Sequence, residues 1–205
     1  MVDNPRTPPG AGRRRTAYTS ESLLAVAVQV FLDRGYDGSS MEDLSKAAGI
    51  TKSSIYHHVR SKEELLRLAT GRALVALFAV LAEPAAVRGP AEGRLRHVLR
   101  RTSEVLLAEL PYVTLLLRVR GNTETERWAL ERRRDFDHHV TSLVEQAAAA
   151  GDLRPDLEPA LVTRLLFGMI NSVAEWYRPQ GRTGPEQVTE AVLALAFDGL
   201  QRAER

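Results

Sequence analysis

The sequence lacks cysteine altogether, and it contains no apolar run long enough to cross a membrane. Without cysteine the chain can form neither a disulfide framework nor a thiolate metal site, which fits a reducing compartment. No window approaches the roughly 18 consecutive apolar residues of a transmembrane helix, and the N-terminal residues include no apolar segment of the signal-peptide type. We therefore expect a cytoplasmic protein that neither spans nor crosses a membrane.

The short motifs of common enzyme chemistry are also missing. There is no glycine-rich phosphate loop, no nucleophile elbow and no His-Glu metal helix, and the histidines do not cluster with carboxylates. We therefore expect no enzymatic activity and no cofactor. Asp135 and His139 lie one helical turn apart, a spacing that suits two metal ligands, but a solvated charged face is the commoner arrangement. Because no third ligand is identifiable, no metal site is predicted.

Lysine is scarce, and its three occurrences, Lys46, Lys52 and Lys62, all fall within 17 residues. The net charge of +2 is too small to indicate nucleic acid by itself, although the sequence pI near 9.1 leans that way. The stretch AAGITKSSIYHHVRSK, residues 47–62, contains no carboxylate. A carboxylate there would repel phosphates, so its absence suits a DNA-facing surface. Chance, a serine-rich turn and a buried Tyr56 are the competing explanations.

Apolar residues recur at three- and four-residue steps through almost the whole chain, and no strand-like alternation appears, which predicts an all-α protein. Serines at positions 20, 40 and 61 are the expected helix caps, and glycines at 35 and 49 the expected helix ends. We expect helices from about 20–34, 41–48, 52–59, 62–81, 91–109, 112–120, 124–150, 156–177 and 185–203. The first three form a small unit, and the long fourth helix joins it to a larger bundle.

The second and third helices have the layout of a helix-turn-helix, with Gly49 in the turn. Ile55 and Val59 lie four residues apart and would seat the third helix against Phe31, Leu44 and Ala48. The small hydroxyl side chains and Lys52 would then face outward, where they could reach bases and phosphates. From these residues alone, DNA binding and a generic packing unit are about equally supported.

A longer pattern favours DNA binding. Residues 23–66, LLAVAVQVFLDRGYDGSSMEDLSKAAGITKSSIYHHVRSKEELL, resemble the N-terminal domain of the tetracycline-repressor (TetR) family of bacterial transcription regulators. The resemblance rests on the spaced set Phe31, Gly35-Tyr36, Ser40, Leu44, Ala47-Ala48-Gly49, Ile55-Tyr56, Lys62 and Leu65. It implies a repressor that binds a palindromic operator as a homodimer and is released by a small-molecule effector.

The family pattern also suggests which residues touch DNA. The predicted contacts are Ser40, Thr51, Lys52, Ser53, Ser54, Tyr56, His57 and Lys62. Within this set, Tyr56 and Lys62 are expected to anchor phosphates. The sequence departs from the pattern at Val59 and Ser45, where an aromatic residue and an alanine are usual. Glu42 occupies a position that some relatives use for a basic base-reading residue, which puts a base contact there in doubt.

The domains expected from the resemblance are a disordered basic arm over residues 1–18, which includes Arg13–Arg15, a DNA-binding domain over 19–65, and a ligand-binding and dimerisation domain over 66–205. The last two helices carry more apolar surface than one helix face needs, so they are expected to pair with their copies in a four-helix interface. The predicted interface residues are Leu165, Phe167, Ile170, Val173, Val188, Val192 and Leu195.

A largely apolar effector is expected between the DNA-binding unit and this interface. The candidate effector contacts are Phe78, Leu107, Tyr112, Leu116, Trp128, Phe136, Asn171 and Trp176. Arg118 and Arg120 are candidates to neutralise an anionic effector such as a carboxylate or an acyl thioester, although a surface position is the alternative for both. A protein-interaction bundle without DNA binding, and a transcriptional activator of the same fold, remain the alternative functions.

Overall fold

The computed structural model describes residues 19–200, and within that range it contains ten helices and no strand. The expected arm, residues 1–18 with Arg13–Arg15, lies outside the described residues. The helices are α1 (Ser20–Arg34), α2 (Met41–Ala48), α3 (Lys52–Tyr56), α4 (Lys62–Leu81), α5 (Pro84–Val87), α6 (Ala91–Ala108), α7 (Leu110–Arg118), α8 (Glu124–Ala150), α9 (Pro159–Trp176) and α10 (Pro185–Leu200). The all-α prediction is confirmed.

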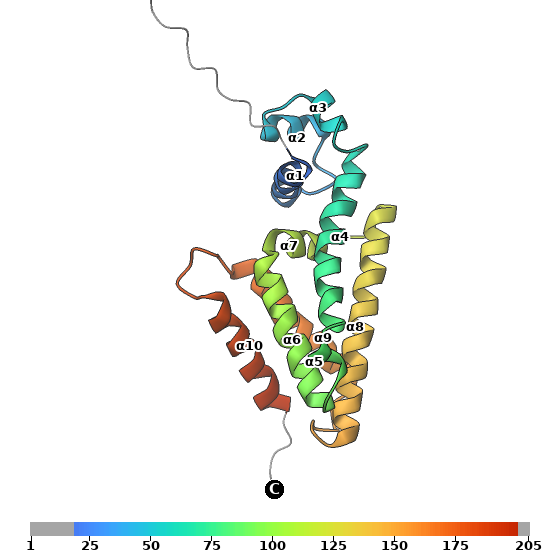
Figure 1. Ribbon diagram of the computed structural model, residues 1–205, viewed down its shortest axis with the longest axis vertical. Helices are drawn as coiled ribbons and strands as arrows, with labels where there is room; N and C mark the ends of the chain where they lie inside the picture. Colours follow the sequence, from blue (N-terminus) through green and yellow to red (C-terminus); the bar gives the residue numbers. More distant parts are fainter. Residues whose placement is uncertain (1–18, 201–205) are drawn as a thin grey trace, which may run out of the picture.

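The helices form an elongated molecule in which α1, α2 and α3 gather at one end (Figure 1). From that end α4 runs into the bundle, where α8 lies beside it, and α6 packs against both α8 and α10. The short α7 crosses beneath α1 and also packs against α4. The small unit therefore rests on α7 as well as on α4.

Local capping sets the helix boundaries of the small unit. Ser40 and Asp43 form the expected capping box at the start of α2, and Gly49 ends that helix in the left-handed conformation, with φ 66°. The predicted cap of α1 is wrong by one residue, because Thr19 accepts from the backbone N–H of Ser22 and Ser20 lies inside the helix. From the sequence alone, the hydroxyl of either Thr19 or Ser20 could cap this helix.

The core of the small unit is the one expected. Ile55 is fully buried and Val59 is 4% exposed, and both belong to a hydrophobic cluster that includes Phe31 and Leu44. The same cluster continues without interruption along α4 into the bundle. Leu68 on α4 is 46% exposed, because the apolar pattern of α4 extends around most of its circumference.

Prolines lie in the first turns of several helices. Pro84 starts α5, and Pro111 lies in the first turn of α7, positions that proline tolerates because those N–H groups have no intrahelical acceptor. α9 begins at Pro159, three residues later than expected, where the carboxylate of Glu158 accepts from the N–H groups of Ala160 and Leu161. Among the described helices, none is both long and apolar enough to span a bilayer.

Two glycine substitutions should have opposite effects on stability. Gly49→Ala places a side chain on a left-handed residue and should lower the free energy of unfolding by about 1–2 kcal/mol. Gly93→Ala lies in the exposed first turn of α6, where an added methyl meets no atom within 4 Å, and should raise the free energy of unfolding by about 0.4–1 kcal/mol. Urea denaturation of both variants checks the signs, and equal shifts would contradict the assigned backbone conformations.

Candidate DNA interface and effector cavity

The first residues of α3 and the residues after it lie on the surface. Lys52, Ser53 and His57 are exposed, and Tyr56 is 52% exposed, while Ile55 between them is buried. One short helix thus presents hydroxyl, imidazole and ammonium groups outward while a single isoleucine holds it to the core. α3 ends at Tyr56, two or three residues earlier than expected, so His57 caps it rather than continuing it.

Several of the candidate hydroxyls already have partners. Thr51 caps α3 by accepting from the N–H of Ser54 at 3.2 Å, and the two hydroxyls lie 2.9 Å apart. Ser40 donates its hydroxyl to the carboxylate of Asp43 at 2.6 Å. Among the described residues, the side chains of Ser53 and Tyr56 make no hydrogen bond. These two side chains are therefore available for new contacts.

Lys62 is half-buried and holds the loop between α1 and α2. Its ammonium donates to the backbone oxygens of Tyr36 and Ser39, each at 2.8 Å, and lies 4.2 Å from the centre of the Tyr36 ring. Burial, with Glu63 adding to it, raises the pKa of Tyr36 to about 12, so this ring stays neutral. Two of the three ammonium protons are thus used inside the protein, which leaves one for a phosphate.

Lys52 forms an ion pair across the turn, with its ammonium 2.8 Å from the carboxylate of Glu42 on α2. Lys46 approaches the other oxygen of the same carboxylate at 3.9 Å. The hydrogen bond from Lys52 lowers the pKa of Glu42, and the same contact raises the pKa of Lys52, so both groups stay charged near neutral pH. All three lysines therefore have partners within the DNA-binding unit.

A cavity of about 450 Å³ lies farther along α4, among α4, α6, α7, α8 and α9. Most of its lining is apolar, from Leu74, Leu77, Leu106, Val113, Leu116, Leu117, Phe136 and Phe167. Thr102 also lines it, and its buried hydroxyl has no hydrogen-bond partner among the described residues. A volume of this size, with a few polar groups among apolar walls, is typical of a small-molecule site.

The polar side of the cavity is positively charged. Arg133, Arg134 and Arg164 line it with His138, and Asp137 is the one carboxylate in the lining. Arg133 is half-buried, and its guanidinium reaches the backbone oxygen of Leu116 at 3.5 Å. Burial lowers the pKa of Arg133 and raises that of Asp137, which means that neither charge is fully compensated by its surroundings.

The expected effector residues divide into three groups. Leu116, Phe136 and Asn171 line the cavity, whereas Phe78 and Trp128 line an open groove outside it, between α4 and α8. Leu107, Tyr112 and Trp176 line neither.

Each of these last three has a clear position elsewhere. Tyr112 is buried against Arg72, whose guanidinium lies 4.3 Å from its ring, Leu107 packs against the core, and Trp176 is 54% exposed. The sequence identified apolar residues but not which face of each helix they occupy.

Arg118 and Arg120 occupy the surface positions that were the alternative to anion binding. Arg118 and Arg120 are exposed and line neither the cavity nor the groove, and Arg118 donates to the backbone oxygen of Leu32 at 3.0 Å. Arg133 was missed, although it lies in the charged stretch that drew attention to Asp135 and His139. The signal was its position three residues before Phe136, which places the two on neighbouring parts of one helix face.

The two candidate metal ligands face other partners. Asp135 accepts from Arg132 at 2.8 Å, and Nδ1 of His139 lies 2.7 Å from the backbone oxygen of Asp135. Within residues 19–200, no three metal-ligating side chains come together.

The predicted interface residues are mostly inside the chain. Five of the seven have side chains packed in the protein's own core: Phe167, Ile170, Val173, Val188 and Val192. Leu165 and Leu195 are exposed, by 64% and 71%. Leu161 and Trp176 are exposed on α9 as well, by 44% and 54%. An apolar helix buries one face in its own bundle, and only the remaining face is available to a partner.

Two family models match the chain. The model "Bacterial regulatory proteins, tetR family" covers residues 23–69, and "Tetracyclin repressor-like, C-terminal domain" covers residues 88–200.

Solved structures and a curated relative agree with these matches. The chain is 65% identical, with a TM-score of 0.84, to a TetR-family regulator from Streptomyces coelicolor A3, over 91% of this chain and 94% of that one. It is 28% identical over 93% of each chain to the transcriptional repressor KstR2 of Rhodococcus jostii. It also shares the fold of AibR, solved with isovaleryl coenzyme A and operator DNA, at 24% identity and a TM-score of 0.74 over 87% of this chain and 97% of that one. Both parts of the chain are thus matched, and the protein belongs to the TetR family of transcription regulators.

Proposed function

We propose that this regulator is a cytoplasmic repressor that binds a palindromic operator as a homodimer and leaves it when an amphipathic anion occupies the cavity. The observation that carries the proposal is the combination of the exposed, acid-free α3, which α4 follows directly, with a cavity that α4 helps to line and that contains the half-buried Arg133. The DNA-binding domain is taken as residues 19–65, and the ligand-binding and dimerisation domain as 66–205.

The proposed DNA contacts are the eight residues of the resemblance, Ser40, Thr51, Lys52, Ser53, Ser54, Tyr56, His57 and Lys62. Ser53 and Tyr56 support the proposal most directly, because their polar atoms are exposed and without internal partners among the described residues. The start of α3 adds backbone N–H groups that suit a phosphate. The lysines of this set supply affinity for DNA of any sequence, and the shorter side chains discriminate between sequences.

The proposed effector has an apolar body and an anionic group. The apolar walls fit the body, while Arg133 and the hydroxyl of Thr102 suit a carboxylate or a thioester carbonyl beside a negative charge. The structure of AibR with isovaleryl coenzyme A gives one example of such a molecule on this fold. An acyl thioester or a free carboxylic acid is therefore the chemical class that we assign to the cavity.

Two connections join the cavity to the DNA-binding domain. Leu65 near the start of α4 belongs to the core of the domain, and Leu74 farther along the same helix lines the cavity. The second connection passes through α7, where Leu116 lines the cavity and Arg118 bonds the end of α1. An effector that prefers the arrangement of α4 and α7 that cannot bind the operator lowers the affinity for the operator. The operator lowers the affinity for the effector by the same factor.

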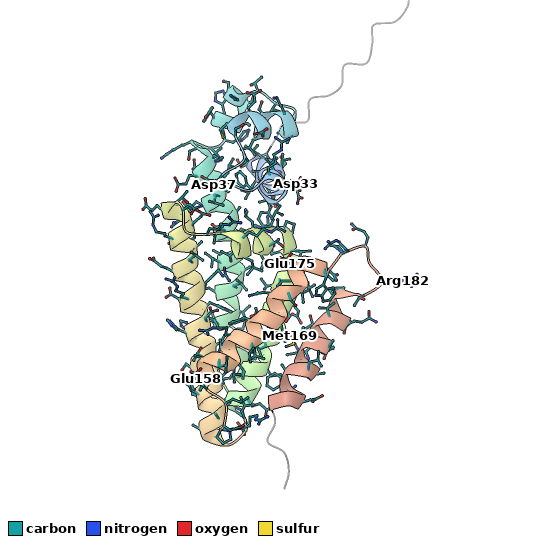
Figure 2. All side chains as sticks on the ribbon, turned by 180° about the vertical axis from the view of Figure 1, so that it is seen from behind. Asp33, Asp37, Glu158, Met169, Glu175 and Arg182 are labelled. Atoms are coloured by element: carbon teal, nitrogen blue, oxygen red, sulfur yellow. The ribbon has the colours of Figure 1, made fainter. Side chains whose placement is uncertain are left out.

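Polar contacts at the corner between α7 and α8 add to the second connection. The amide of Asn122 donates to the carboxylate of Asp37 at 2.9 Å, and the carboxylate of Glu63 accepts from the N–H of Thr125 at 3.2 Å. Figure 2 shows Asp33 and Asp37 in the part of the DNA-binding unit that lies next to the bundle. The DNA-binding domain is thus tied to the bundle at several points, which lets a shift in the bundle change its orientation.

The proposed dimer surface is the outer face of α9 and α10. On α9, residues 161, 165, 168, 172 and 176 follow one another at three- and four-residue steps, and all are exposed. Their side chains are Leu, Leu, Gly, Ser and Trp, an apolar and small set that suits close helix packing. Leu195 and two exposed alanines, Ala191 and Ala194, extend the face onto α10. Figure 2 shows α9 and α10 side by side on this side of the molecule.

Replacing Leu165 with glutamate should produce a folded monomer, because this side chain is 64% exposed and a charge there opposes pairing. Gel-filtration mass with light scattering should fall to about half, and affinity for duplex DNA should fall with it. Val75→Glu is the control, since Val75 is 73% exposed on α4, away from this face. A Leu165→Glu protein that remains a dimer would exclude this face as the interface.

Replacing Lys62 with methionine should weaken binding to every duplex and flatten the dependence of log K on log salt by about 0.9 per phosphate contact, or about 1.8 for a dimer. It should also lower the free energy of unfolding by about 1–3 kcal/mol, because the carbonyls of Tyr36 and Ser39 lose a charged donor. Lys46→Met is the matched control for lost charge. A destabilised Lys62→Met protein with an unchanged salt slope would show that Lys62 supports the loop without touching DNA.

Replacing Arg133 with methionine should lower the affinity for anionic effectors by about tenfold to a hundredfold, because a charge-assisted hydrogen bond contributes about that much. Calorimetric titration with short- and medium-chain fatty acids and their coenzyme A thioesters would measure this. The free energy of unfolding of the ligand-free protein should not fall, since burial already disfavours that charge. Arg127→Met on the same helix, outside the cavity lining, is the control. Equal affinity in both variants would remove Arg133 from the effector site.

A further inference from the structure

We infer that Glu42 and Lys52 act as one unit that reads a single G·C base pair of the operator, with Glu42 as a specificity-determining residue. This inference rests on the proposed DNA-binding function and assigns it a base contact at a residue where the family pattern gave none. The ion pair joins α2 to the first residue of α3 across the turn of the helix-turn-helix.

The geometry of the pair suits an approaching base pair. The ammonium of Lys52 and the carboxylate of Glu42 are 2.8 Å apart, and each side chain is 50% exposed. The ammonium of Lys46 lies 3.9 Å from the second carboxylate oxygen, so Glu42 is held from two sides. A cation and an anion are thus presented next to each other on the surface that carries Ser53 and Tyr56.

This spacing matches the major-groove edge of a G·C pair. There the O6 acceptor of guanine and the N4 donor of cytosine are joined by a hydrogen bond of about 2.9 Å. Lys52 would donate to O6 and N7 of guanine while Glu42 accepts from N4 of cytosine. The order of groups along that edge, two acceptors and then a donor, is the order that an ammonium followed by a carboxylate requires.

An A·T pair fits less well. Its edge presents an acceptor, a donor and a second acceptor, followed by the methyl group of thymine. There the carboxylate can accept from the adenine amino group while the ammonium donates to O4 of thymine, but the ammonium then faces one acceptor and a methyl group instead of the two acceptors of guanine. The pair therefore favours G·C through the second acceptor, and the carboxylate fixes which side of the base pair the ammonium takes, whereas Lys52 alone would accept any nearby acceptor or phosphate.

Stability offers only a small competing reason for the pair, because Glu42 lies in the first turn of α2, where the helix dipole favours an acid by a modest amount. Ion pairs between exposed side chains contribute about 0–1 kcal/mol to folding, so the fold does not depend on this one. A carboxylate on a DNA-binding surface also repels phosphates, which lowers affinity for random sequence. A residue that weakens general affinity and adds little stability is accounted for when it increases the ratio of specific to random binding.

The test is selection of duplexes from a fully randomised pool by the full-length protein and by Glu42→Ala. The wild-type protein should select a palindrome with one strongly preferred G·C pair in each half-site, by about 5- to 150-fold over other pairs. Glu42→Ala should keep the other preferred positions, lose most of the preference at this one, and bind random duplex more tightly. Asp156→Ala, which removes an exposed carboxylate paired with Arg154 far from α3, should match the wild type.

Three results would overturn the inference. A Glu42→Ala protein that selects the same sequence with the same preferences would show that Glu42 reads no base. A uniform gain of affinity at every sequence, with no change in preference, would show that Glu42 acts only by holding or repelling charge. A wild-type protein that selects no sequence over random duplex would overturn the proposed repressor function as well, which separates that failure from the first two.

Discussion

The arrangement of this protein depends on one uninterrupted hydrophobic core that α4 carries from the DNA-binding unit into the bundle. Leu65, Leu66 and Ala69 at the start of the helix are fully buried with the side chains of α1, while Leu74 and Leu77 one to three turns later line the cavity. Because interiors are closely packed, a change at one end of such a helix cannot be absorbed without movement elsewhere. The cavity proposed for the effector and the surface proposed for DNA therefore belong to one packed body.

Charge on the DNA-binding unit is organised differently from what composition alone implies. The chain has a net charge of only +2, and each of its three lysines already interacts with a group inside the unit. Lys62 stabilises a loop through carbonyl oxygens, and Lys46 and Lys52 share the carboxylate of Glu42. For Lys46 and Lys52, a contact with DNA then requires an exchange of partners. Such an exchange adds little to the affinity for random-sequence DNA. It favours duplexes whose polar groups can replace the protein partners of these lysines.

Much of the fold was predictable because helix boundaries are local. Ser40 and Gly49 placed α2 at its observed bounds, Gly35 placed the end of α1, and the spacing of Ile55 and Val59 identified how α3 is seated. Which face of each bundle helix is buried was not predictable in this way. Phe167 and Leu165 are both apolar and two residues apart, yet one is buried and the other is 64% exposed, and the difference depends on neighbours that are distant in sequence. Arg133 was missed for the same reason, since a buried cation and a solvated one look alike in a charged stretch.

The length of α4 converts a small tilt of the helix into a larger displacement of its far end. Its 20 residues extend for about 30 Å at 1.5 Å per residue, and the DNA-reading side chains lie beyond one end of it. A tilt of about 5° over that length displaces the far end by about 2.6 Å, which is close to a whole hydrogen-bond distance. A bound molecule that shifts the cavity wall only slightly would therefore be enough to change the spacing of the two DNA-binding units of a dimer relative to the duplex.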